Sequence, residues 1–295
     1  MHNLLISVTE LQALQAAGAR TMIFDCSADL SNPAAGEEQY RKAHIPGAVY
    51  ANLETELSDK GVVGLDGKHH PHPDAASGGR HPLPSREKFA MWLSGVGFSN
   101  DMQAVVYDRN NATYCGRLWW MLKWAGHDAV AVLDGGLQAW QAAGGETTDQ
   151  EEPSHFQSNF ELGPALRTLA ASSDVMRGLG KPGQTVLDAR ATPRFKGEVE
   201  PIDPVAGHIP GALNRPFGQN IEADGKFKPA AQLRAEFDQL LDGRDPASVV
   251  HHCGSGVSAI PNVLAMEIAG YGPVALYAGS WSEWVSDRSR PVEKG

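Results

Sequence analysis

Short apolar runs alternate along this chain with longer stretches whose apolar residues recur every three or four positions. The runs lie at residues 22–25, 104–108, 186–188 and 248–252 and have the length and composition of buried strands. The longer stretches at residues 117–124 and 258–269 have the apolar spacing of helices. Strands that alternate with helices form parallel sheets whose two faces are covered. The pattern therefore predicts an α/β fold, a parallel sheet flanked by helices on both faces.

This pattern occurs twice. The run His-Ile-Pro-Gly-Ala stands at residues 44–48 and again at 208–212, and each copy follows a strand that ends in an aspartate, Asp25 or Asp188. A further strand and a segment containing Gly and Trp match downstream in the same order. Four matching elements at nearly constant spacing predict a tandem duplication of one domain.

The two repeats differ mainly in one connection. The first repeat has a longer segment around residues 57–84, which is rich in Gly, His and Pro and is predicted to be an irregular loop. Loops of this length in compact domains often carry function. A polar stretch without apolar periodicity separates the repeats. We predict a first domain at residues 1–145, a linker at 146–163 and a second domain at 164–295.

Composition and charge disfavour several classes of protein. With 25 basic and 35 acidic residues the formal net charge is −10, which disfavours nucleic acid or an anionic membrane as partner. No apolar run approaches the roughly 18 residues of a membrane-spanning helix, and residues 4–8 lack the features of a signal peptide. The three cysteines form no Cys-x-x-Cys pair, which argues against disulfides and structural zinc. We expect a cytoplasmic protein without metal or cofactor.

Cys253 opens the segment of strongest chemical character. It follows an apolar strand and begins the sequence Cys-Gly-Ser-Gly-Val-Ser before a helix. Sites in parallel α/β domains form at the carboxyl ends of strands, and backbone N–H groups in a tight loop there favour a thiolate. Gly254 and Gly256 permit the backbone angles of such a loop. Cys253 is thus a candidate nucleophile in a catalytic second repeat, whereas Cys26 and Cys115 are expected to be structural residues of a non-catalytic first repeat.

The pair His252-Cys253 also begins the phosphatase pattern His-Cys-x5-Arg. In that pattern the arginine binds the phosphate with two hydrogen bonds. Here Ala259 stands at the arginine position, and the loop contains no Arg or Lys. A phosphate dianion would lack its counter-charge, which argues against a phosphatase.

These motifs together resemble the two-domain rhodanese-like sulfurtransferases over essentially the whole chain. They are the repeated His-Ile-Pro-Gly-Ala, Asp-Ala-Arg at 188–190 with Arg194-Phe195, residues 253–258, and Gly-Ser-Trp-Ser-Glu-Trp at 279–284. The resemblance implies a tandem pair of rhodanese-like domains and transfer of a sulfane sulfur through a persulfide on Cys253. Members specific for thiosulfate carry basic residues in the loop. The neutral loop here is similar to that of members using 3-mercaptopyruvate, which would leave as pyruvate.

The resemblance also implies helpers for Cys253. Ser255 aligns with a loop serine that acts with a histidine and an acid of the first domain, and His81 and Glu54 take those positions. A structural hydroxyl, a solvated loop histidine and a surface glutamate are the alternatives. The N–H groups of the loop would stabilise the persulfide anion, so its remaining residues are candidates for substrate binding: Gly254, Gly256, Val257 and Ser258.

The resemblance implies two arginines for the carboxylate of the donor, and only one is found. Arg194 aligns with the first, with a surface arginine near a turn as the alternative. Where the second is expected, the chain has Ile202 or Asp203. Arg215 is a candidate replacement.

Three functions remain open at this point. The main hypothesis is transfer of sulfur from 3-mercaptopyruvate to a thiol or cyanide acceptor, with a thioredoxin-like reductant as a candidate partner. A thiosulfate:cyanide sulfurtransferase is favoured by the missing arginine and disfavoured by the neutral loop. A relay or binding module would instead accept a persulfide from a partner protein.

Overall fold

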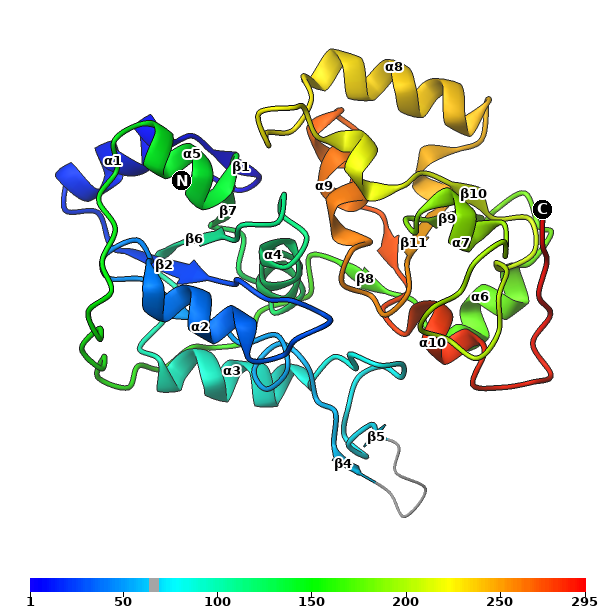
Figure 1. Cartoon of the computed structure of the whole chain (residues 1–295), viewed down its shortest axis with the longest axis horizontal. Helices are drawn as coiled ribbons and strands as arrows, with labels where there is room; N and C mark the ends of the chain where they lie inside the picture. Colours follow the sequence, from blue (N-terminus) through cyan, green and yellow to red (C-terminus); the bar gives the residue numbers. More distant parts are fainter. Residues whose placement is uncertain (64–68) are drawn as a thin grey trace. The chain divides into compact units, whose positions relative to one another are not determined.

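The structure is a computed structural model that describes residues 1–63 and 69–295 (Figure 1). Its internal contacts divide the chain into two compact units. Unit 1 consists of Met1–Ser58, Pro84–Leu166 and Glu222–Phe227, and unit 2 of Asp59–Leu83, Arg167–Ile221 and Lys228–Gly295. Residues 59–83, which belong to the first repeat in sequence, therefore pack with the second.

Unit 1 is built on a parallel sheet in the order β1-β7-β6-β2-β3. Its strands are β1 (Leu5–Ile6), β2 (Thr21–Asp25), β3 (Val49–Tyr50), β6 (Gln103–Tyr107) and β7 (Val130–Leu133). Its helices are α1 (Val8–Ala16), α2 (Ala35–Lys42), α3 (Arg86–Gly95), α4 (Cys115–Trp124) and α5 (Gly136–Ala142). All five residues of the central β6 are buried, as expected where helices cover both faces of a sheet.

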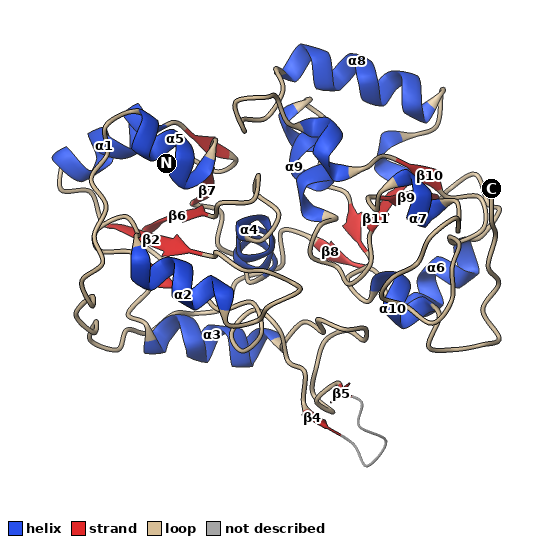
Figure 2. Cartoon of the chain, in the orientation of Figure 1, coloured by secondary structure: helices blue, strands red, loops and turns tan. Residues whose placement is uncertain are grey.

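Unit 2 repeats this plan with the order β10-β9-β11-β12-β8, again parallel (Figure 2). Its strands are β8 (Thr168–Leu169), β9 (Thr185–Asp188), β10 (Leu213–Asn214), β11 (Val249–His252) and β12 (Ala275–Leu276). Its helices are α6 (Ser172–Gly178), α7 (Thr192–Phe195), α8 (Ala230–Leu241), α9 (Ile260–Ile268) and α10 (Ser280–Trp284), with 3₁₀ turns η1 (Phe217–Asn220) and η2 (Pro246–Ser248). The two sheets match strand for strand, which confirms the predicted α/β fold and its duplication.

Two local expectations need correction. The helix predicted from Ser258 begins at Ile260, because the preceding loop continues through Gly256 and Pro261 fits the first turn of a helix. The connection predicted to be irregular contains an antiparallel pair of strands, β4 (Val62–Val63) and β5 (His69–His70).

Candidate functional site

Cys253 lies at the carboxyl end of β11, between β9 and β12 in the sheet of unit 2. Its side chain is buried, and its backbone is held from two sides by the start of α10. Its N–H donates to Ser280 Oγ at 3.1 Å, and its carbonyl accepts the N–H of Trp281 at 3.0 Å. Ser280 itself has a φ of +57°, a left-handed conformation that serine rarely adopts. The backbone of Cys253 is therefore fixed by the fold.

Residues 253–259, the Cys253 loop, run from β11 to α9. Gly256 has a φ of +74°, and a β-carbon there would lie 2.1 Å from the carbonyl oxygen of Ala278, so only glycine fits. In the described part of the chain, the backbone N–H groups of Gly254, Ser255, Val257 and Ser258 donate to no protein acceptor. The loop thus offers N–H groups to an anion, and the predicted substrate-binding residues Gly254, Gly256, Val257 and Ser258 all belong to it.

Unit 1 has a loop of the same length at the matching place in its sheet, with a different sequence. Tyr107 pairs with Asp25 in one sheet as His252 pairs with Asp188 in the other, so Asp108 is the counterpart of Cys253. The next helix begins the same number of residues later in both repeats. Unit 1 therefore carries a carboxylate where unit 2 carries a thiol.

The carboxylate of Asp108 is surrounded by its own loop. It accepts backbone N–H bonds of 2.8 to 3.1 Å from Asn110, Ala112, Tyr114 and Cys115. This loop geometry thus gathers N–H groups around an anion, which in unit 1 is part of the protein.

The structure brings together Ser255 and His81, the two residues that the family resemblance implies as partners. Ser255 Oγ and His81 Nδ1 share a hydrogen bond of 2.8 Å, and both residues are buried. Two contacts hold the chain beside His81 against α10. The N–H of Arg80 donates to Ser282 Oγ at 3.1 Å, and a β-carbon on Gly79 would lie 2.4 Å from the carbonyl oxygen of Gly279.

Two acidic residues are candidates to complete this group, Glu54 and Asp59. Glu54, the predicted acid, belongs to unit 1, where its N–H donates to Asn52 Oδ1 at 2.8 Å. Asp59 belongs to unit 2 with His81, is buried, and donates its N–H to the carbonyl of Pro82 at 2.8 Å. Sequence reasoning missed Asp59. Its position at the start of the long connection that ends in His81 was the available signal.

The arginines near the loop also differ from expectation. Arg194, which the resemblance implies as the first donor-binding arginine, lies beside Gly254, with its guanidinium paired to Glu200 and Asp203. Arg215 donates to Asn220 Oδ1 at 2.7 Å and to Glu236 Oε2 at 2.6 Å, so its charge is used in a structural ion pair.

Arg80, which the sequence analysis did not consider, lies against Gly254. A β-carbon built on Gly254 would be 3.1 Å from Arg80 Nη2. The signal available in the sequence was its position directly before His81.

A buried ion pair supports the carboxyl ends of β9 and β11. Arg190 Nε donates to Asp188 at 3.0 and 3.1 Å, and its Nη2 donates to the same carboxylate at 2.6 Å. The guanidinium also stacks on Trp281, at 4.6 Å from the ring centre. Burial lowers the pKa of the adjacent His252, although Asp188 partly opposes this. Arg190 is therefore the bidentate partner of the Asp188 carboxylate.

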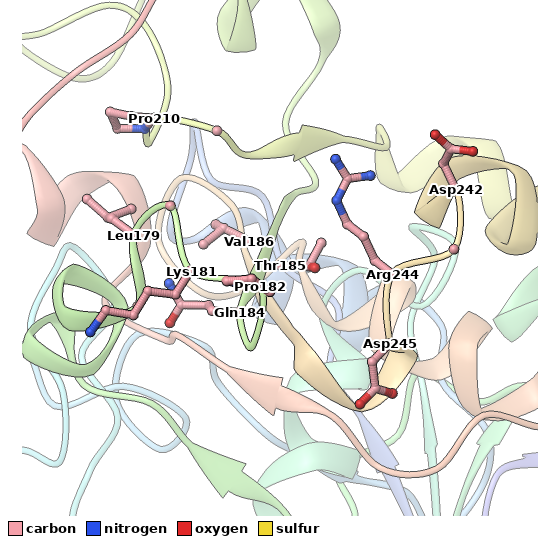
Figure 3. Close-up of a pocket in the computed structure, with 14 residues that line it drawn as sticks. Leu179, Lys181, Pro182, Gln184, Thr185, Val186, Pro210, Asp242, Arg244 and Asp245 are labelled. Carbon is pink, nitrogen blue, oxygen red and sulfur yellow. The ribbon is translucent and has the colours of Figure 1, made fainter.

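Other features of the described residues add no second site. A hollow of about 600 Å³ lies at the opposite, amino-terminal edge of the sheet of unit 2, lined by Lys181, Thr185 and Arg244 among others (Figure 3). Among the described residues no group of three His, Cys, Asp or Glu side chains is placed to hold a metal ion. No helix in the described ranges is long and apolar enough to span a bilayer.

Comparison with known proteins places this geometry in context. The family described as Rhodanese-like domain matches residues 7–143 and 172–287. A Pseudomonas aeruginosa protein, named provisionally as a 3-mercaptopyruvate sulfurtransferase, is 44% identical over 93% of this chain and 92% of its own. A Mycobacterium tuberculosis protein, named provisionally as a thiosulfate sulfurtransferase, is 39% identical over 99% and 97%. The solved 3-mercaptopyruvate sulfurtransferase of Leishmania major has a TM-score of 0.77 and 30% identity, covering 96% of this chain and 74% of that one.

Proposed function

We propose that this chain, which belongs to the rhodanese-like family and is a sulfurtransferase, takes sulfur from 3-mercaptopyruvate and holds it as a persulfide on Cys253. The observation that carries the proposal is a thiol at the carboxyl end of a central strand, opening a loop of available N–H groups. The matching loop of unit 1 holds the carboxylate of Asp108 with four such groups. The Cys253 loop would stabilise a thiolate or persulfide in the same way. Unit 1, with Asp108 in place of a thiol, would be non-catalytic.

The first step is an attack on sulfur. The thiolate of Cys253 forms an S–S bond with the sulfur of 3-mercaptopyruvate, and the C–S bond of the donor breaks. Its electron pair passes to the carbon skeleton as the enolate of pyruvate. The enolate takes up a proton, the donor's thiol proton is lost, and Cys253 is left as a persulfide anion beside pyruvate.

Ser255 and His81 would assist the departure of pyruvate. Their 2.8 Å hydrogen bond lets the serine hydroxyl donate toward the developing enolate oxygen while the imidazole exchanges the proton. Asp59, buried beside the carbonyl of Pro82, is the acid in unit 2 that we propose to position His81. Glu54 remains a second proposal for this role.

The second step returns Cys253 to the thiolate. Cyanide attacks the outer sulfur and leaves as thiocyanate, or a thiol attacks it and leaves as a persulfide. A dithiol reductant of the thioredoxin type would then form its own disulfide and release hydrogen sulfide. All three cysteines are free, which is typical of a reducing compartment such as the cytoplasm. We propose that location, and with it a thiol acceptor, because thiols are kept reduced there.

The choice of donor rests on charge. The Cys253 loop contains no basic residue, which suits a donor with one carboxylate better than a dianion. One observation favours thiosulfate instead, namely that the chain has Ile202 or Asp203 where the family resemblance implies a second donor-binding arginine.

The donor assignment is tested by loading the reduced protein with sulfur. We expect intact-protein mass spectrometry to show the gain of one sulfur atom from 3-mercaptopyruvate, at least about tenfold faster than from equimolar thiosulfate. Pyruvate should appear in equal amount, and cyanide should remove the added mass. Faster loading from thiosulfate would overturn the assignment, and no loading from either donor would favour the relay module.

Replacing His81 tests the proposed proton transfer. His81→Gln is expected to slow loading from 3-mercaptopyruvate by about 10²-fold in single turnover, because general acid–base assistance is lost. Since His81 and Ser255 act as one unit, His81→Gln combined with Ser255→Ala should be no slower than the slower single variant. His72→Gln, an exposed histidine paired with Asp74 in the same connection, is the control and should load normally. If the double variant instead slows loading by the product of the two single effects, His81 and Ser255 do not act as one unit.

A further inference from the structure

Two guanidinium groups converge on Gly254, the residue that follows the nucleophilic cysteine. A β-carbon built on Gly254 would lie 3.1 Å from Arg80 Nη2 and 3.7 Å from Arg194 Nη1. The two arginines come from different parts of unit 2, the long connection and α7. Their convergence is therefore a product of the tertiary fold.

A single carboxylate holds both arginines in place. The side chain of Asp203 is only 3% exposed and accepts hydrogen bonds from Arg80 Nη1 and, at 3.3 Å, from Arg194 Nη2. Arg194 is further fixed by Glu200, which accepts from its Nε at 3.2 Å and its Nη2 at 2.6 Å. Asp203, one of the two residues that the resemblance leaves as candidates for the position of the missing arginine, thus orients Arg80 from another segment.

Each arginine retains one terminal nitrogen that is not used in these bonds. In the described ranges of the chain, neither Arg80 Nη2 nor Arg194 Nη1 donates to a protein acceptor, and these are the nitrogens nearest Gly254. The Arg80 side chain is 33% exposed, so solvent and small molecules can reach it. An anion above Gly254 would meet two charged donors beside the reacting sulfur.

We propose that Arg80 is the second arginine of the donor site and that, with Arg194, it binds the donor's carboxylate above Gly254. This inference rests on the proposed function. Asp203 acts as a positioning residue that keeps Arg80 at the loop. Asp203 and Glu200 balance the two cations, so the site suits one carboxylate rather than a dianion.

The proposal is tested with two alkylating reagents of nearly equal size. Iodoacetate and iodoacetamide both form a C–S bond with the Cys253 thiolate and release iodide, but only iodoacetate is an anion. The ratio of their rates therefore reports the positive charge beside the sulfur, because changes in thiolate content or access affect both reagents alike. We expect Arg80→Gln and Arg194→Gln to lower the ratio about tenfold, and Arg80→Lys to keep it within about twofold.

Arg234→Gln is the control, because Arg234 is an exposed arginine of α8 paired with Asp238. It should leave the ratio unchanged. In steady state, Arg80→Gln should raise KM for 3-mercaptopyruvate about tenfold with little change in kcat. Equal losses in both alkylation rates, with an unchanged ratio, would mean that Arg80 only supports the loop and would overturn the proposal.

Failure of the donor assignment has a different signature. If the wild-type protein takes no sulfur from 3-mercaptopyruvate while Arg80→Gln still lowers the ratio, the arginine pair binds an anion of another donor. If the wild-type protein takes sulfur from 3-mercaptopyruvate and the ratio of alkylation rates is unchanged in Arg80→Gln, the donor assignment is supported and the proposed role of Arg80 is wrong.

Discussion

Replacing Cys253 by serine is expected to reduce sulfur transfer by about 10⁴-fold or more, because the sulfur that forms the new S–S bond is removed. A serine hydroxyl at the same place is a weak nucleophile without a strong base. Intact-protein mass spectrometry should show no added sulfur after exposure to 3-mercaptopyruvate. Formation of thiocyanate in the presence of cyanide should fall to the rate without enzyme.

Cys26 and Cys115 provide matched controls for this variant. Both are buried in unit 1, and burial together with the charges of Asp25 and Asp108 raises the pKa of each thiol well above its usual range. They therefore remain uncharged thiols at neutral pH. Cys26→Ala and Cys115→Ala should each still gain one sulfur atom. Sulfur added to the Cys253→Ser protein would contradict the assignment of the nucleophile.

Replacing Arg190 by methionine should lower the free energy of unfolding of unit 2 by about 3–5 kcal/mol. The change leaves the buried carboxylate of Asp188 without its bidentate partner and removes the stacking on Trp281. Urea denaturation followed by tryptophan fluorescence measures the loss. Arg177→Met, which removes an exposed ion pair with Asp174 on α6, should cost less than about 0.5 kcal/mol.

The loss at Arg190 should also depend on pH in a defined direction. In the wild-type protein, burial alone would raise the pKa of Asp188, but His252, Arg190 and hydrogen bonds hold it below 3.8. The stabilisation from Asp188 is thus complete above the pKa of 3.8 that it has in the unfolded chain, and falls only in strong acid.

Without Arg190, the contribution of Asp188 and His252 to stability depends on pH in the opposite direction. The charge of Arg190 lowers the pKa of both Asp188 and His252, so its removal raises the pKa of both groups in the folded state. A group whose pKa is raised in the folded state gives stability that is lost as pH rises. The loss in free energy of unfolding caused by Arg190→Met should therefore be larger at pH 8 than at pH 5. A deficit that is equal at both would show that Asp188 is not the group left unpaired.

Much of the fold follows from local sequence. Buried runs such as those ending at Asp25 and Asp188 have the apolar pattern of central strands, and the structure places them as β2 and β9 in matching positions. The loop after Cys253 was predictable for the same reason, because strand, glycines and helix are contiguous. Helix ends were less predictable. The start of α9 at Ile260 depends on Gly256 approaching Ala278 from another segment.

Residues that act together from distant segments were harder to predict. His81 was found through family resemblance, and its contact with Ser255 depends on the 59–83 segment packing with unit 2. Arg80 and Asp59 lie in that same segment and were missed, because their only signal in the sequence is proximity to His81, which does not say what their side chains contact.

Local sequence was sufficient to predict the α/β architecture and its duplication and to single out Cys253 as the candidate nucleophile, since all three depend on residues that are close along the chain. Tertiary structure alone decided which charges surround that nucleophile. It uses the charge of Arg215 in an ion pair with Glu236, and it holds Arg80 beside Gly254 through Asp203. Electrostatic interactions depend on distance in space, and the packing that sets those distances joins residues far apart in the sequence.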